Sequence, residues 1–74
     1  MTEFKEMGRT TVNDSRDIVM SQVIEDGEVK GININSYIRT NGYTGFTKGG
    51  VFVPVEKVQD FKNLVERIMT DSND

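Results

Sequence analysis

The chain has 74 residues, a net charge of −3 and neither Cys nor His. A chain of this length forms one small domain and buries only about 60% of the surface that its unfolded form exposes. Disulfides and Cys- or His-based metal sites cannot stabilise so small a core, and no apolar run is long enough to span a membrane. We therefore expect a homodimer inside the cell.

The beginning of the chain has only weak signals for secondary structure. Residues 1–15 are interpreted as a flexible arm or a short edge strand, with Thr10–Val12 as the strand. The side chains of Asn13–Ser15 favour a turn. We expect residues 16–70 to form the single domain and the polar residues 71–74 to be a disordered tail.

Short segments rich in β-branched residues predict antiparallel strands in the middle of the chain. The first is Asp17–Ile24, and a turn follows at Glu25–Glu28, where Gly27 can take a positive φ. The pair Gly49-Gly50 favours a kink or a bulge at the start of the last strand. Three further strands are expected at 30–40, 43–48 and 50–53.

The segment from Gly31 to Pro54 has the clearest pattern in the chain. Apolar and polar residues alternate in its first part, which is typical of a strand that is buried on one side. The apolar side consists of Ile32, Ile34 and Ile38, and the polar side consists of Asn33, Asn35, Tyr37 and Arg39. Asn41-Gly42 then favours a type I′ turn, because both residues tolerate the positive φ that this turn needs. The sequence thus predicts a hairpin whose polar face is the candidate for function.

An amphipathic helix is predicted after the strands. Pro54 suits the first helical turn, because its missing N–H would be unpaired there in any case. Apolar residues then recur at spacings of three and four up to Met69 and form one stripe. We expect an α+β fold in which this helix covers one face of the sheet, with part of the stripe in the core or at the dimer interface. Those core or dimer residues are Val58, Phe61, Leu64, Val65 and Ile68.

The same part of the chain resembles the positive-cofactor-four family of transcriptional coactivators, in a prokaryotic or phage-type form. The resemblance rests on Ile34–Tyr37, on Asn41–Pro54 and on the helix, and it extends from about Asp17 to Met69. Its most specific part is Tyr-Thr-Gly-Phe-Thr-Lys-Gly-Gly-Val. It implies a curved four-stranded antiparallel sheet followed by one C-terminal helix (ββββα) and a homodimer. It also implies binding of single-stranded DNA on the concave face of the sheet, in transcription or replication, and hence a location in the cytoplasm or at the nucleoid.

Several positions depart from the pattern of that family. The turn at 25–28 is acidic, where the family has an aromatic residue and lysines. Asn35 replaces an arginine that faces the DNA, and Ile38 replaces an aromatic residue. Lys48-Gly49 stands in place of a basic pair. Each departure removes a phosphate contact or a stacking surface, so the resemblance implies weak binding or a different use of the surface.

Proteins that bind unpaired nucleic acid use cations to contact phosphates and aromatic rings to stack on bases. Segment 27–50 contains three basic residues and one acidic residue, although the chain as a whole is acidic. The candidates for stacking are Tyr37, Tyr43 and Phe46, the candidates for phosphates are Lys30, Arg39 and Lys48, and Asn33 and Asn35 can hydrogen-bond bases or sugars. Arg9 and Arg16 in the N-terminal part are additional candidates for the rim of this site. The expected partners are single-stranded DNA or RNA, a second copy of the chain, and proteins of transcription or replication.

Structural explanations for the same residues stay open. Phe46 is equally well explained as a core residue, and Tyr37 and Tyr43 can form a cross-strand pair. The three cations can also serve solubility at an edge strand. The alternative function is a protein-interaction module on the same dimeric fold, with weak or lost nucleic-acid binding. The acidic net charge and the departures from the family favour it.

The composition argues against catalysis. His and Cys, which are the commonest general base and thiol nucleophile, are missing from the sequence. The acidic residues near the turns, Asp14 with Asp17 and the 25–28 group, lack the spacing of a calcium loop. We therefore expect no enzyme activity, no catalytic residues, no cofactor and no metal site.

Overall fold

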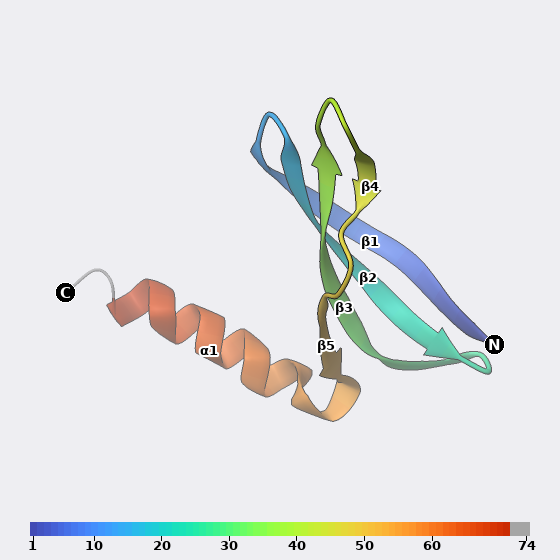
Figure 1. Cartoon of the computed structure of the whole chain (residues 1–74). Helices are drawn as coiled ribbons and strands as arrows, with labels where there is room; N and C mark the ends of the chain where they lie inside the picture. Colours follow the sequence, from blue (N-terminus) through green and yellow to red (C-terminus); the bar gives the residue numbers. More distant parts are fainter. Residues whose placement is uncertain (72–74) are drawn as a thin grey trace.

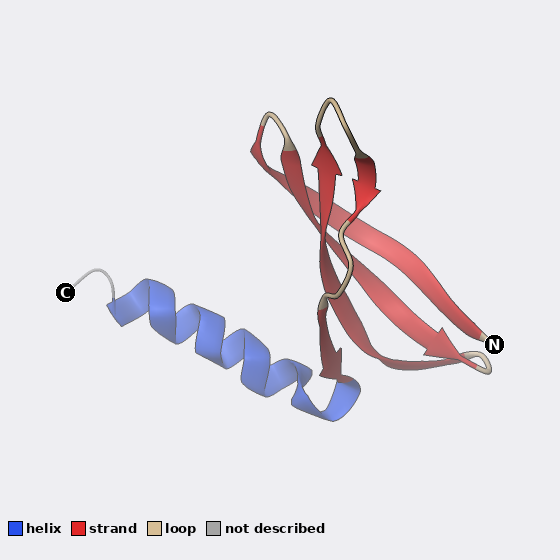
Figure 2. Ribbon diagram, in the orientation of Figure 1, coloured by secondary structure: helices blue, strands red, loops and turns tan. Residues whose placement is uncertain are grey.

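The computed structural model describes residues 1–71 and shows, within them, an antiparallel sheet followed by one C-terminal helix (Figures 1 and 2). The strands are β1 (Thr2–Asn13), β2 (Arg16–Glu25), β3 (Glu28–Arg39), β4 (Thr44–Phe46) and β5 (Val51–Pro54). A 3₁₀ turn, η1 (Val55–Lys57), leads into helix α1 (Val58–Asp71). The predicted α+β class is confirmed. Asp71 belongs to the helix and not to a tail, and the rest of the predicted tail lies outside the described residues.

Strands β4 and β5 are two parts of one strand position beside β3. β4 pairs with the end of β3 and β5 pairs with its first half. Between them the chain leaves the ladder at Thr47–Gly50. Asn35 holds this loop, because its Oδ1 accepts from the Thr47 hydroxyl at 2.9 Å and its Nδ2 donates to the Thr47 carbonyl at 3.3 Å. The predicted interruption near Gly49, whose φ is 79°, is confirmed.

The N-terminal segment is a strand, so the expectation of a flexible arm is wrong. β1 lies at the edge of the sheet, but its 12 residues make it as long as β3. It pairs with β2 from Thr2 opposite Glu25 to Asn13 opposite Arg16. The predicted turn follows, where the Ser15 N–H donates to Asn13 Oδ1 at 2.9 Å. β1 is held in place by its hydrogen bonds to β2, a strand that begins only after residue 15.

The turn with two positive φ angles lies at Asp26-Gly27 and not at Asn41-Gly42. Asp26 has φ 53° and Gly27 has φ 81°, as a type I′ turn between two strands requires. Asn41-Gly42 does connect two paired residues, because Thr40 N–H donates to the Tyr43 carbonyl at 2.8 Å. The hairpin is therefore confirmed, but neither central residue has a positive φ. β4 has only three residues, so the turn has little strand twist to match.

Helix α1 extends away from the sheet and does not cover either face (Figure 1). Val53 of β5 is only 6% exposed, but the helix that follows is largely open to solvent. Because η1 follows β5 directly, no loop allows the helix to fold back. The expectation that the stripe forms a core within one protomer is wrong. Val58 and Phe61 are half-buried, and Leu64, Val65 and Ile68 are exposed.

The protomer exposes more surface than a compact protein of its mass. Its accessible surface is 5754 Å² at a mass of 8.4 kDa, for which about 4,600 Å² is typical. Its radius of gyration is 14.4 Å, whereas about 11 Å is typical of this length. Among the described residues, Val19 and Val53 are the buried hydrophobic side chains. The described residues therefore form a small hydrophobic core for a chain of this length.

Candidate nucleic-acid interface

The strand register assigns the side chains to two faces of the sheet, because residues directly opposite each other point to the same side. The two faces are those that the alternation in β3 predicts. The polar face consists of Phe4, Glu6, Arg9, Asp17, Val19, Ser21, Asn33, Asn35, Tyr37, Arg39, Phe46 and Phe52. The apolar face consists of Ile18, Met20, Ile32, Ile34, Ile38, Val51 and Val53. Five residues predicted for the site therefore lie on one face.

A hollow of ≈ 280 Å³ lies in the polar face and collects residues from four strands. Phe4 and Phe46 supply two exposed aromatic rings, and Val19, which is only 2% exposed, supplies an apolar floor. Ser21 and Asn33 add a hydroxyl and an amide that make no hydrogen bond within residues 1–71. An open apolar surface with a few free polar groups is typical of a ligand site.

The two asparagines predicted for the site differ in their contacts. Asn35 also lines the hollow, but its amide is engaged with the Thr47–Gly50 loop, and its Oδ1 accepts from the Ser36 N–H at 2.8 Å as well. Asn33 keeps its amide open toward the hollow. Of the two, Asn33 is therefore the group that can contact a ligand, and Asn35 positions the loop.

A buried carboxylate at one end of the polar face binds two arginines. Asp17 is 4% exposed, and its Oδ2 accepts from Arg39 Nη1 at 2.8 Å and from Arg9 Nη1 at 3.2 Å. The bond from Arg39 holds the pKa of Asp17 below its usual value and raises the pKa of Arg39. Arg39 Nη2 also donates to the carbonyls of Asn13 and Asp14 at 3.4 and 3.3 Å. Arg39, predicted as a phosphate contact, thus ties the end of β3 to the β1–β2 turn.

Two aromatic rings pack against each other beside this carboxylate. The ring centroids of Tyr37 and Phe46 are 5.2 Å apart, with an angle of 80° between the planes. The Arg9 Cζ lies 5.0 Å from the centroid of the Tyr37 ring, within the range of a cation–π contact. Phe46 is 46% exposed, so it is not a core residue. Its free surface is available for stacking.

Tyr43 is placed in its own hairpin and not in the hollow. Its hydroxyl donates to the carbonyl of Phe46, and its ring lies against Gly45, where an added Cβ would meet the hydroxyl oxygen at 3.2 Å. The aromatic partner of Tyr37 is Phe46, so the predicted pair of tyrosines is absent from the described residues. Tyr43 is best explained as a residue that stabilises the hairpin.

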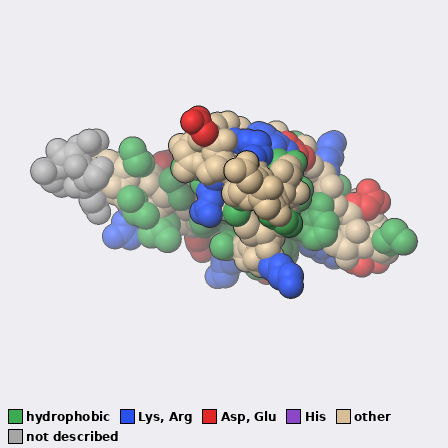
Figure 3. All heavy atoms as spheres, turned by 45° about the horizontal axis from the view of Figure 1, so that its top comes forward, with side chains coloured by type: hydrophobic (Ala, Val, Ile, Leu, Met, Phe, Trp, Pro, Cys, Tyr) green, Lys and Arg blue, Asp and Glu red, His purple; other side chains and the backbone are tan. Residues whose placement is uncertain are grey.

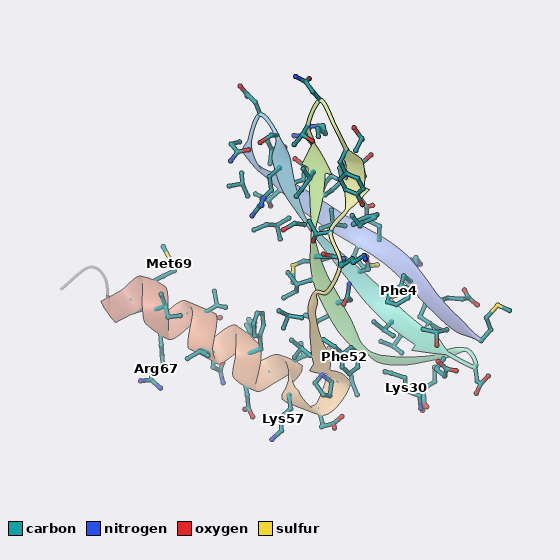
Figure 4. The ribbon with its side chains drawn as sticks, in the orientation of Figure 1. Phe4, Lys30, Phe52, Lys57, Arg67 and Met69 are labelled. Atoms are coloured by element: carbon teal, nitrogen blue, oxygen red, sulfur yellow. The ribbon has the colours of Figure 1, made fainter. Side chains whose placement is uncertain are left out.

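The remaining predicted cations lie outside the hollow and differ in their partners. Lys30 forms an ion pair with Glu28 near the β2–β3 turn, and this contact raises the pKa of Lys30 (Figure 4). Lys48 is exposed and has no ion pair within residues 1–71. Lys48 is therefore the predicted cation that remains open to an anionic ligand.

Sequence reasoning did not assign several residues of the polar face to the site. Phe4 enters the hollow because β1 pairs with β2, and its own segment gave no signal for this (Figure 4). Phe52 lies opposite Asn33, and its ring is so close to Gly31 that a Cβ there would be 2.9 Å away. The alternation in Val51–Val53 was a usable signal for Phe52. Arg9 was a candidate for the rim of the site, and the register places it on the polar face, whereas Ser21 was visible only through the register.

Two further classes of site are not found in residues 1–71. No group of three or more acidic side chains there could hold a metal ion. No helix in that range is long and apolar enough to cross a membrane. Comparisons of the chain with models of known families, with curated proteins and with solved structures give no match. The argument for a function therefore depends on the polar face itself.

Proposed function

We propose that the polar face binds an unpaired nucleic-acid strand, with single-stranded DNA as the main ligand. The observation that carries this proposal is the hollow in which the rings of Phe4 and Phe46 are open beside the free amide of Asn33. Stacking on such rings contributes about 1–3 kcal/mol per base and accepts any base. An amide both donates and accepts, so it complements the edge of a base.

Two cations outside the hollow support the same ligand. Lys48 is open, and the guanidinium of Arg9 lies on the polar face next to the floor residue Val19. The chain has a net charge of −3, so general attraction to a polyanion is weak, and binding depends on these local groups. We therefore expect modest affinity that falls as the salt concentration rises.

A homodimer formed through the helix and the apolar face is the second part of the proposal. Ile18, Met20 and Val51 on that face are 39–56% exposed, and Leu64, Val65 and Ile68 of α1 are 44–59% exposed. Figure 3 shows hydrophobic side chains on the open surface at the end of the molecule where the helix lies. Contiguous apolar surface of this kind marks an interaction site. A second copy supplies both elements at once, which gives a closed, two-fold symmetric dimer.

The biological role that we propose, transcription or replication of the coactivator type, follows from the resemblance of Ile34–Pro54 alone. The polar face is compatible with it, because the segment that carries the resemblance contributes Asn35 and Phe46 to the lining of the hollow. The arginines held by Asp17 favour the alternative, a protein-interaction module with weak nucleic-acid binding.

Fluorescence anisotropy with labelled oligo(dT), at low and moderate salt, tests the proposal. We expect Phe4→Ala to weaken binding by about tenfold, because one stacking surface is lost. Phe4 is 63% exposed, so its removal leaves stability nearly unchanged. Met7→Ala is the matched control, because Met7 is an exposed apolar residue of the same strand that does not line the hollow.

The proposal is refuted if the wild-type protein shows no salt-dependent binding to oligo(dT) at low salt. A dimer in solution together with that result would favour the protein-interaction module. Equal losses from Phe4→Ala and Met7→Ala would show that binding does not use the hollow.

A further inference from the structure

Arg9 is held on the polar face in an orientation that suits a phosphate. Its Nε and Nη2 donate to Glu6 Oε2 and Oε1, each at 2.9 Å, which is a bidentate fork. Its Nη1 donates to the buried Asp17, and the ring of Tyr37 lies next to its guanidinium. A carboxylate and a phosphate fit the same planar fork of donors. The guanidinium is therefore already oriented, and its outer edge is occupied by a carboxylate.

A β-bulge places Glu6 and Arg9 on the same side of the sheet. In a regular strand, residues three apart point to opposite faces. The register of β1 shifts between Glu6 and Gly8, where Met7 is the extra residue. Glu6 then lies opposite Ser21, and Arg9 lies opposite Val19. Ser21 and Val19 both line the hollow. The fork of Arg9 consequently borders the proposed base site.

The two carboxylates that contact Arg9 differ in how easily they can be replaced. Asp17 is buried, binds Arg39 as well, and is a fixed part of the sheet. The side chain of Glu6 is 44% exposed, and Arg9 is its partner among the described residues. An exposed ion pair of this kind is weak and exchanges readily. Of the two anions on Arg9, only Glu6 can give way to a ligand.

We propose that Arg9 is a phosphate-binding residue of the polar face and that Glu6 occupies, in the free protein, the position of a backbone phosphate. This inference rests on the proposed binding of an unpaired strand. When the strand binds, a phosphodiester replaces the Glu6 carboxylate on Nε and Nη2, and a neighbouring base enters the hollow. Arg39 cannot serve in this way, because its donors are used by Asp17 and by the carbonyls of the β1–β2 turn.

The test compares two charge-neutralising variants of β1. Glu6→Gln removes the competing carboxylate. Glu3→Gln changes the net charge equally, but Glu3 lies opposite Ile24 on the other side of β1 and has no ion pair within residues 1–71. Anisotropy with labelled oligo(dT) should show about two- to fivefold tighter binding for Glu6→Gln than for Glu3→Gln. The slope of log K against log salt should be similar for both variants, because both make the same phosphate contact, and it should become shallower by about 0.7 when Arg9→Gln is added to Glu6→Gln.

Adding Arg9→Gln to the Glu6→Gln variant should remove the gain. Equal affinity for Glu6→Gln and Glu3→Gln, with a wild-type protein that binds, would overturn this inference and leave the proposed function intact. No binding by the wild type or by Glu6→Gln at low salt would overturn both. Thermal unfolding curves of all variants serve as the control for a general loss of structure. We expect the unfolding midpoints of Glu3→Gln and Glu6→Gln to agree within about 2 °C.

Discussion

The polar face and the apolar surface of this protein differ in how their side chains find interaction partners. On the polar face, Asp17 binds both Arg9 and Arg39, and Asn35 binds the Thr47–Gly50 loop. Within residues 1–71, exposed hydrophobic residues remain on the apolar face (Ile18, Met20 and Val51) and on α1 (Leu64, Val65 and Ile68). Figure 4 shows the length of α1 that lies beyond the sheet, with Arg67 and Met69 on opposite sides of the helix.

The difference follows from the nature of the two interactions. A hydrogen bond or ion pair is complete with one well-placed partner, so a single sheet can satisfy its own polar groups. Hydrophobic stabilisation grows with the area removed from water, at about 25 cal/mol per Å², and a chain of this length lacks a second layer to supply that area. The polar face can therefore exchange partners one at a time, whereas the apolar surface is covered only when a second layer packs on it.

The largest expected effect comes from a charge in the stripe of α1. Leu64→Asp should weaken the dimer by on the order of a hundredfold, because an unpaired carboxylate would be buried at the interface. Analytical ultracentrifugation over a range of concentrations measures the effect. Asn63→Asp is the matched control, because it places the same charge on the other side of the helix. A wild-type protein that stays monomeric at high concentration would contradict the role given to the apolar surface.

The next largest effect is expected at the contact between β3 and β5, the strand that joins the sheet to the helical segment. A Cβ at Gly31 would lie 2.2 Å from the Val53 carbonyl and 2.9 Å from the Phe52 ring. Gly31→Ala should therefore cost about 3 kcal/mol of stability, because β5 must move away from β3. Gly8→Ala is the control, because no atom lies within 4 Å of the added methyl group. Urea unfolding that gives equal stabilities for both variants would show that β5 does not pack closely on β3.

The smallest effects are expected from substitutions of Asn33 and Asn35, which distinguish a binding role from a structural role within the polar face. Asn35→Ala should lower stability by about 1–2 kcal/mol, because the Thr47–Gly50 loop loses its hydrogen bonds. Asn33→Ala should leave stability within about 0.5 kcal/mol of the wild type. It should nevertheless weaken oligo(dT) binding by about threefold to tenfold, because one hydrogen bond to a base is lost. Unfolding curves and anisotropy measured on both variants decide whether the two asparagines differ as proposed.

Local patterns predicted most of the elements but fewer of the contacts. The alternation in β3 placed Asn33 and Tyr37 on one side and the isoleucines on the other, and the register agrees. Arg39 was correctly placed on the polar face, but its partner Asp17 lies in another strand, so its structural role was not visible. Phe4 was missed because its segment has no clear alternation.

The sequence by itself determined the class of fold, the two-sided character of the sheet and the amphipathic nature of the helix. These properties depend on residues within a few positions of each other, whose spacing repeats with the period of the element. The tertiary structure decided which residues form the hollow, which cations are already paired, and that α1 extends away from the sheet. Those properties depend on the pairing of β1 with β2, on the bulge at Met7 and on the direct β5–η1 connection, which bring together or separate residues far apart in the chain.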